Sequence, residues 1–137
     1  MRAIDTNVLV RALVDDTPEQ TARARALLKA HPVYIPVTVA LELEWVLRSR
    51  YGFPAKHIAE TFENLAALEN AVLAERTAVL AAAAKLAQGW DFADALHHAL
   101  SRGCDDFVTF DDNLAKRSRR GAGVDPAITQ LQSTSPR

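Results

Sequence analysis

Four short apolar runs, separated by longer stretches with helical periodicity, most constrain the fold of this chain. They cover residues 3–4, 33–35, 71–73 and 107–110. Short apolar strands that alternate with helices are typical of a parallel sheet covered by helices on both faces. The sequence therefore predicts an α/β fold in which ligands bind beyond the carboxyl ends of the strands.

The stretches between these runs carry helix signals. Thr17 and Pro18 suit the N-cap and the first position of a helix, and Gly89 and Gly103 each end one. A short last strand is predicted over 121–124. The tail from residue 130 is predicted to fray, which leaves a single domain over 1–129. The predicted helices cover 5–14, 18–31, 38–48, 54–70, 76–88, 91–102 and 111–116.

Composition excludes several classes of protein. The 137 residues are 49% apolar, which is ample for one packed core and excludes a disordered chain. No apolar run is long enough to cross a membrane, and Asp5 and Arg11 break any signal-peptide pattern, so we expect a cytoplasmic protein with no membrane partner. The net charge is −1, so a nucleic-acid partner needs local basic patches or a metal ion. The single cysteine, Cys104, excludes an internal disulfide and is expected to be buried.

One carboxylate, Asp5, interrupts an otherwise apolar, core-like stretch near the N-terminus. An ionised carboxylate in such surroundings is costly unless a charge or hydrogen bonds compensate it. Three further acids, Glu42, Asp94 and Asp111, lie at or beside the ends of apolar runs. In a parallel sheet Asp5, Glu42 and Asp111 fall at the same edge, so we expect the acids to converge.

Each acid also has a purely structural interpretation. Asp5 and Asp111 suit helix N-caps, and so does Asp91, with Asp94 in the turn that follows. Caps need no common location, whereas a metal site does. Two neighbouring pairs leave open which acid has the functional role: Glu42 with Glu44, and Asp111 with Asp112.

Four converging carboxylates would repel one another, so without a cation at least one would bind a proton. Mg²⁺ prefers oxygen ligands and keeps several waters, which suits a site with no histidine or cysteine. Such an ion can lower the pKa of a bound water and neutralise a phosphate oxygen. If the acids converge, the pattern therefore indicates metal-assisted hydrolysis.

Other polar and aromatic residues carry weaker signals. His97 and His98 show no ligand spacing and are expected at the surface, while Trp45 and Trp90 are expected in the core or an interface. The basic residues near the end of the chain are either a solvated helix end or a track for a phosphate backbone. The candidates for backbone contacts are Arg48, Lys116, Arg117, Arg119 and Arg120.

Four segments in order resemble the motifs of PIN-domain proteins, and specifically of the VapC toxin ribonucleases of type II toxin–antitoxin systems. The segment Ile4-Asp5-Thr6-Asn7-Val8-Leu9-Val10 resembles the first motif. The stretch from Ile35 to Arg48, with Glu42 three residues before Trp45, resembles the second motif. The segment Asp91-Phe92-Ala93-Asp94-Ala95-Leu96 resembles the third motif, and Thr109-Phe110-Asp111 resembles the fourth. The resemblance extends from residue 1 to about residue 120.

This resemblance implies a three-layer α/β/α sandwich with a central parallel sheet, and an endoribonuclease dependent on Mg²⁺ or Mn²⁺. Asp5, Glu42, Asp94 and Asp111 would be the catalytic, metal-holding residues, with Asp5 and Asp94 the surest ligands. Asn113 departs from the pattern, because many relatives carry another acid there. Residues implied beside the metal ligands are Thr6, Asn7, Thr109 and Asp91.

The implied partners are an RNA substrate, a second copy of the chain and a cognate VapB-like antitoxin, with a higher toxin–antitoxin assembly on DNA as a further possibility. A different class of function, a non-catalytic interaction module acting through a DNA-binding partner, stays open. A phosphatase is disfavoured because Asn7 stands where such an enzyme would need a second Asp. One or two metal ions are equally compatible with the sequence.

Overall fold

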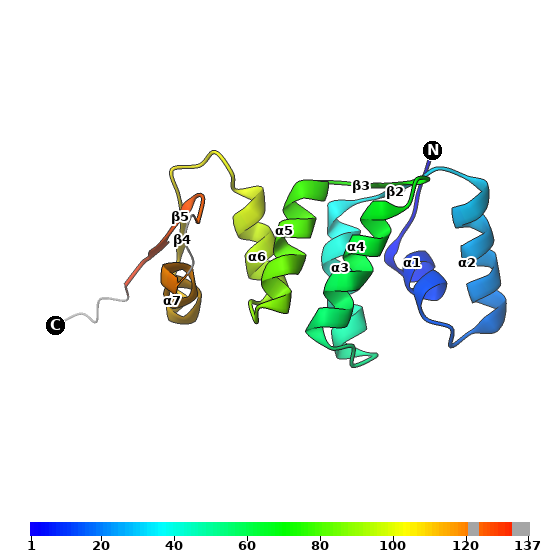
Figure 1. Cartoon of the computed structure of the whole chain (residues 1–137), viewed down its shortest axis with the longest axis horizontal. Coiled ribbons are helices and arrows are strands. Elements are labelled where there is room, and N and C mark those ends of the chain that lie inside the picture. The colour runs from blue at the N-terminus through cyan, green and yellow to red at the C-terminus, as the bar shows by residue number, and fades with distance from the viewer. Residues whose placement is uncertain (121–123, 133–137) are drawn as a thin grey trace.

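The structure, a computed structural model, describes residues 1–120 and 124–132 (Figure 1). Strands and helices alternate along this part of the chain, as the apolar runs predict. The strands are β1 (Arg2–Ala3), β2 (Val33–Ile35), β3 (Ala71–Leu73), β4 (Asp106–Thr109) and β5 (Ala127–Gln130). The helices are α1 (Thr6–Leu13), α2 (Pro18–Ala30), α3 (Val37–Ser49), α4 (Ala55–Ala67), α5 (Arg76–Ala87), α6 (Phe92–Leu100) and α7 (Asp112–Arg120).

The strand pairings of the described residues are all parallel, which confirms the predicted α/β class. They form two sheets rather than one: a three-stranded sheet in the order β1-β2-β3, and a pair of β4 with β5. In the first sheet Tyr34 lies opposite Ala3 on one side and Val72 on the other. Figure 1 shows β4, β5 and α7 beyond α6, at the opposite end of the molecule from α1 and α2. Each of β1, β3, β4 and β5 therefore has one edge without a strand partner in the described residues.

The core lies among α3, α4, α5 and α6, beneath the first sheet. Phe62 of α4 and Phe92 of α6 stack with their ring centroids 5.1 Å apart. Both rings are fully buried, as are Leu43 of α3 and Val79 of α5. This packing fixes the position of α6, whose first turn carries Asp94.

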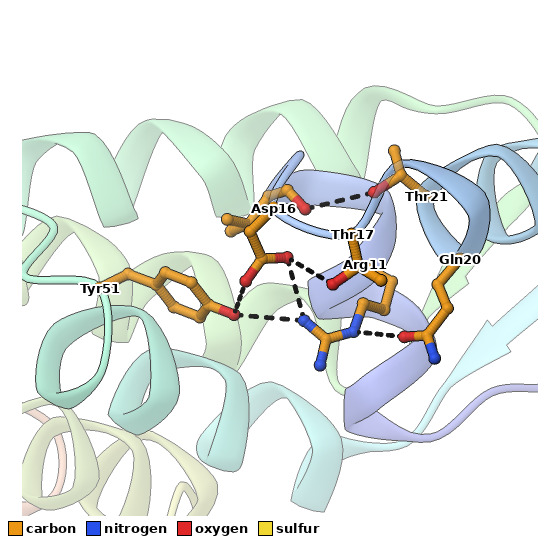
Figure 2. Close-up of polar contacts among 7 residues, drawn as sticks. Arg11, Asp16, Thr17, Gln20, Thr21 and Tyr51 are labelled. Carbon is orange, nitrogen blue, oxygen red and sulfur yellow. Dashed lines mark hydrogen bonds and ion pairs between the residues drawn. The ribbon is translucent and has the colours of Figure 1, made fainter.

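A polar network joins α1 to α2 and to the chain that follows α3 (Figure 2). The Asp16 carboxylate accepts hydrogen bonds from Arg11 Nη1 at 3.0 Å and from the Tyr51 hydroxyl at 2.8 Å. Arg11 Nε also donates to Gln20 Oε1 at 2.8 Å. Because Arg11 lies in the last turn of α1, the network restrains the helix that begins next to Asp5.

The second sheet packs on α6 through a buried histidine. His98 is 1% exposed, its Nε2 lies 2.7 Å from the carbonyl oxygen of Pro126, and its ring meets the ring of Phe107 edge to face. The expectation that His98 lies at the surface is therefore wrong, because the chain returns over α6 after α7. His97, one position earlier, is exposed as expected. Cys104, expected to be buried, is exposed in the segment before β4.

Two elements near the end of the chain differ from the prediction. Helix α7 continues to Arg120, beyond the predicted end at residue 116, because Leu114 and Ala115 anchor it through one buried side. Strand β5 was missed: it pairs with β4 over Ala127–Gln130, and the Leu131 N–H donates to the Thr109 carbonyl at 2.7 Å. Of the predicted strand over 121–124, residues 121–123 lie outside the described residues, and Val124 is in no strand.

Both sheets expose apolar side chains on one face. Tyr34 and Val72 are 38% and 45% exposed on the first sheet, and Val108, on β4, and Phe110, which follows it, are 53% and 64% exposed. Parallel sheets usually have both faces covered, so these surfaces are unusual for the fold. None of the described helices combines the length and apolar character that a membrane span requires.

Candidate active site

Asp5 and Glu42 line the same small cavity, of about 260 Å³, beyond the carboxyl end of β1. Asp5 comes from the junction of β1 and α1, and Glu42 from the second turn of α3. Thr6 and Asn7 also line this cavity, so the first predicted motif and the predicted acid of the second meet there. Asp5 is exposed rather than buried, because the chain turns outward at the start of α1.

Asp5 also acts as the N-cap of α1. Its Oδ1 accepts a hydrogen bond from the Val8 N–H at 3.0 Å. This confirms the structural interpretation of Asp5 without excluding a second role, because a carboxylate has two oxygens and several lone pairs. The cap orients the carboxylate at the mouth of the cavity that it shares with Glu42.

A second acidic group lies at the start of α6 and α7. Asp91 caps α6 by accepting from the Asp94 N–H at 3.0 Å. Burial raises the pKa of the half-buried Asp94 carboxyl, and the negative charges of Asp91 and Asp111 raise it further, while His97 opposes them. A nearby cation would therefore stabilise the ionised form of Asp94.

Strand β4 and helix α7 position Asp111 in this group. Its Oδ1 accepts from the Leu114 N–H at 3.1 Å, which caps α7. Its own N–H donates to Thr109 Oγ1 at 3.0 Å. Thr109 therefore orients the backbone of Asp111.

The predicted acids therefore form two groups: Asp5 with Glu42, and Asp91 with Asp94 and Asp111. Within the described residues, no three His, Cys, Asp or Glu side chains are close enough to hold a metal ion together. The grouping follows from the two sheets, since Asp5 follows β1 and Asp111 follows β4, and these strands are not neighbours. The convergence of all four acids within one chain is not observed.

The two neighbouring acids left open by the sequence are both engaged in ion pairs. Glu44 is 3% exposed and accepts from Arg48 Nε at 2.8 Å. Asp112 pairs with Lys116 at 2.9 Å, and the hydrogen bond from Lys116 lowers the pKa of the Asp112 carboxyl. Glu42, which lines the cavity, is the better placed of the first pair.

The predicted basic residues have different surroundings. Arg48 is held by Glu44, whose hydrogen bond and charge raise the Arg48 pKa, and the negative charge of Asp91 adds to this effect. Arg119 Nε donates to the Ala115 carbonyl of its own helix at 3.3 Å. Arg117 and Arg120 instead line a cavity of about 950 Å³.

Sequence reasoning missed other residues of this large cavity. Lys85 of α5 lies with its Nζ 4.6 Å from the centroid of the Trp90 ring and 3.3 Å from His98 Nδ1. Arg102, which follows α6, lines the same cavity. A lysine five residues before a tryptophan is a weak signal in one sequence, because the pairing depends on how α5 packs against α6.

The donor chemistry of the acidic groups suits a hard divalent ion. Each group offers at least two carboxylates, and Mg²⁺ commonly binds through one or two carboxylates together with waters and substrate phosphates. The capping oxygens of Asp5 and Asp111 each leave a second oxygen for another ligand. The residues present therefore fit a divalent cation, with phosphate the ligand expected to complete its coordination.

Comparison with known proteins adds one finding. The family model described as PIN domain matches residues 3–120, which is most of the chain. Domains of this kind are typically nuclease modules and generally depend on metal ions. No curated protein and no solved structure matches the chain.

Proposed function

We propose that this chain, which belongs to the PIN domain family, is a metal-dependent endoribonuclease that cleaves RNA phosphodiesters. The observation that carries the proposal is the group of Asp91, Asp94 and Asp111, in which burial and the two neighbouring negative charges raise the pKa of Asp94. Clusters of carboxylates with perturbed pKa values are typical of functional sites. A second acidic group, Asp5 with Glu42, lines a cavity, and these two acids belong to the first two segments that resemble PIN-domain motifs.

In this proposal Asp5, Glu42, Asp94 and Asp111 hold Mg²⁺ or Mn²⁺. The ion supplies charge neutralisation at the phosphate and lowers the pKa of a water molecule. Asp91 and Thr109 position the acids through the hydrogen bonds already described, while Thr6 and Asn7 line the cavity beside Asp5. The acids also accept the proton that the attacking water releases.

We further propose that the enzyme is the toxin of a toxin–antitoxin pair in the cytoplasm. Family members often pair with antitoxins and bind RNA. A VapB-like antitoxin that covers the acidic residues would inhibit the enzyme, and such pairs can assemble further on DNA. Support for this part comes from the resemblance of the four motifs to the VapC toxins.

The protein is proposed to act as a homodimer in which β4 of one chain pairs with β1 of the other. Both strands have an open edge in the described residues, and open edges of parallel strands favour pairing with another chain. Parallel pairing of β4 with β1 would place Asp111 of one protomer beside Asp5 of its partner, because each acid lies two residues after the end of its strand. The two acidic groups would then complete one site.

The test of the nuclease proposal is the Asp5→Asn variant in an RNA cleavage assay with Mg²⁺ or Mn²⁺. We expect cleavage to fall by about 10²–10³-fold, since several kcal/mol of charge stabilisation would be lost. Glu60→Gln, which changes an exposed carboxylate on α4, is the matched control and should keep full activity. Cleavage at the wild-type rate by Asp5→Asn would remove the proposal.

A second candidate, a non-catalytic interaction module, is favoured by one observation: in the described residues no three of these acids lie close enough together to hold a metal ion. Thermal melting separates the two candidates. A nuclease site should show a melting temperature that rises with Mg²⁺ or Mn²⁺ concentration, because ligand binding stabilises the folded state. Neither a metal-dependent rise nor RNA cleavage is expected of an interaction module.

A further inference from the structure

We propose that the large cavity between α5, α6 and α7 binds the phosphate backbone of single-stranded RNA outside the acidic residues. Its volume is about 950 Å³, and four cations line it: Lys85, Arg102, Arg117 and Arg120. Two carboxylates, Glu75 and Asp125, also line it, so cations exceed carboxylates by two. The choice of RNA as the strand rests on the proposed nuclease function, whereas the recognition of phosphate rests on the cavity alone.

Lys85 is the strongest single argument for an anionic ligand. It is half-buried, and burial lowers the pKa of its ammonium group. In the described part of the chain, Lys85 makes no ion pair with a carboxylate. A half-buried cation that lacks a counter-charge is partly desolvated, so an anion that enters the cavity would stabilise it.

His98 explains how Lys85 is held ready for such a ligand. The Pro126 carbonyl can only accept, so His98 Nε2 carries the proton and donates to it at 2.7 Å. The unprotonated Nδ1 then accepts from Lys85 Nζ at 3.3 Å. An ammonium has three N–H groups, so two remain for the Trp90 face and for an entering oxygen. The arrangement fixes the cation without neutralising it.

The arginines approach the cavity from two other elements. Arg102 follows the end of α6, while Arg117 and Arg120 belong to the last turns of α7. Gly89 makes room for one of them: a Cβ at this residue, whose φ is +101°, would lie 3.1 Å from Arg117 Nη1. Guanidinium groups bind phosphate oxygens through paired hydrogen bonds, which makes arginine well suited to a phosphate backbone.

Residues that line the cavity are adjacent in sequence to the acidic residues. Trp90 lines it and directly precedes Asp91, which caps α6, while Arg102 lies beyond the other end of α6. A helix of nine residues is about 14 Å long. This length accommodates a short stretch of an extended strand that begins at the acids. Figure 1 shows α6 between α5 and α7 in the part of the molecule nearer the C-terminus.

The experiment uses Trp90 as a fluorescent reporter in a Trp45→Phe background. The probe is a 12-nucleotide RNA with 2′-O-methyl groups, in EDTA, so that no cleavage occurs. We expect a saturable change of fluorescence. The double variant Lys85→Met/Arg117→Ala should bind at least ten-fold more weakly, and the slope of log K against log salt should fall by about 0.7 for each cation removed. Arg23→Ala, which removes an exposed arginine paired with Glu19, is the matched control and should bind like the parent.

Three outcomes decide the proposal. Weaker binding and a smaller salt slope in the double variant, with an unchanged melting temperature, support it. Unchanged affinity overturns it, as does tighter binding of poly-glutamate than of the RNA, which would assign the cavity to an acidic protein segment. A protein that binds RNA through these residues but never cleaves it would contradict the nuclease function and leave the cavity assignment in place.

Discussion

At the scale of single residues, Asp16 shows how a surface carboxylate can link three segments of the chain. The hydrogen bond from the Tyr51 hydroxyl lowers the pKa of Asp16, and the positive charge of Arg11 acts in the same direction. A carboxyl group whose pKa is lower in the folded state stabilises that state only while it is ionised. This contribution is complete above the pKa of the unfolded chain, about 3.9. It is lost as the pH falls through the lower, folded value.

We therefore expect Asp16→Asn to lower the melting temperature at pH 7, because the ion pair with Arg11 is lost and the bond from Tyr51 weakens. The difference from wild type should persist down to about pH 4 and shrink below it, as the wild-type carboxyl itself becomes protonated. Melting curves between pH 2.5 and pH 8 measure this. Asp15→Asn, at the exposed neighbouring position, is the control. A difference that grew as the pH fell would contradict the assignment.

Residue identity alone predicted capping roles correctly and burial poorly. Asp5, Asp91 and Asp111 are all N-caps, as a local rule about helix starts predicts. Burial depends on which segments pack over a residue, and this is not a local property. His98 is therefore buried by the chain that returns after α7, while Cys104 is exposed because no described element covers the segment before β4.

At the scale of elements, helix α3 carries a buried acid whose charge is balanced within the helix. Glu44 is buried, and the Arg48 guanidinium, one turn later, is about half exposed. A buried carboxylate that loses its partner keeps the cost of desolvation. The pair therefore stabilises α3 less through attraction than by avoiding an unpaired buried charge.

We expect Arg48→Ala to lower the free energy of unfolding by about 1–3 kcal/mol, because Glu44 would remain buried without its partner. This is below the loss typical of fully buried pairs, since solvent screens the exposed guanidinium. The double variant Glu44→Met/Arg48→Ala should recover most of the loss. Urea denaturation measures both values, and Arg23→Ala serves as the control for an exposed pair. Equal losses in the single and double variants would be inconsistent with a desolvated Glu44.

The elements that sequence periodicity predicted well are those with one continuous buried side. Helices α3 and α5 and strands β2 and β3 lie close to the predicted ranges. Strand β5 was missed because its alternation is short and follows a segment with turn-forming residues. A strand of this kind is defined by its partner, here β4, and not by its own composition.

At the scale of the whole molecule, the predicted α/β class and the parallel pairing were recoverable from the sequence, whereas the separation into two sheets was not. Alternation of strands and helices predicts parallel pairs, but not which strands are neighbours. The same limit applies to the site. Two of the four predicted acids, Asp5 and Glu42, share a cavity. The negative charge of Asp111 raises the pKa of Asp94, so these two acids form a second group. In the proposed dimer, pairing of β1 with β4 would join the two groups.

The proposed homodimer makes the completeness of the site depend on two chains. If β4 of one protomer pairs with β1 of its partner, each site takes Asp5 from one chain and Asp111 from the other. Asp5→Asn and Asp111→Asn proteins should then be inactive separately. A mixture of equal parts, unfolded and refolded together, should recover about a quarter of wild-type cleavage, because half of the dimers are mixed and each mixed dimer has one intact site.

Two controls make this complementation specific to the strand edge. Mixing Asp5→Asn with Glu42→Gln should give no recovery, because both acids belong to the same chain's half of the site. Adding Val108→Lys, which places a charge on the exposed face of β4, should abolish recovery and shift the protein to a monomer in analytical ultracentrifugation. Since β1 and β4 have no other described strand partner at these edges, a monomeric wild type that cleaves RNA at full rate would contradict the two-chain site.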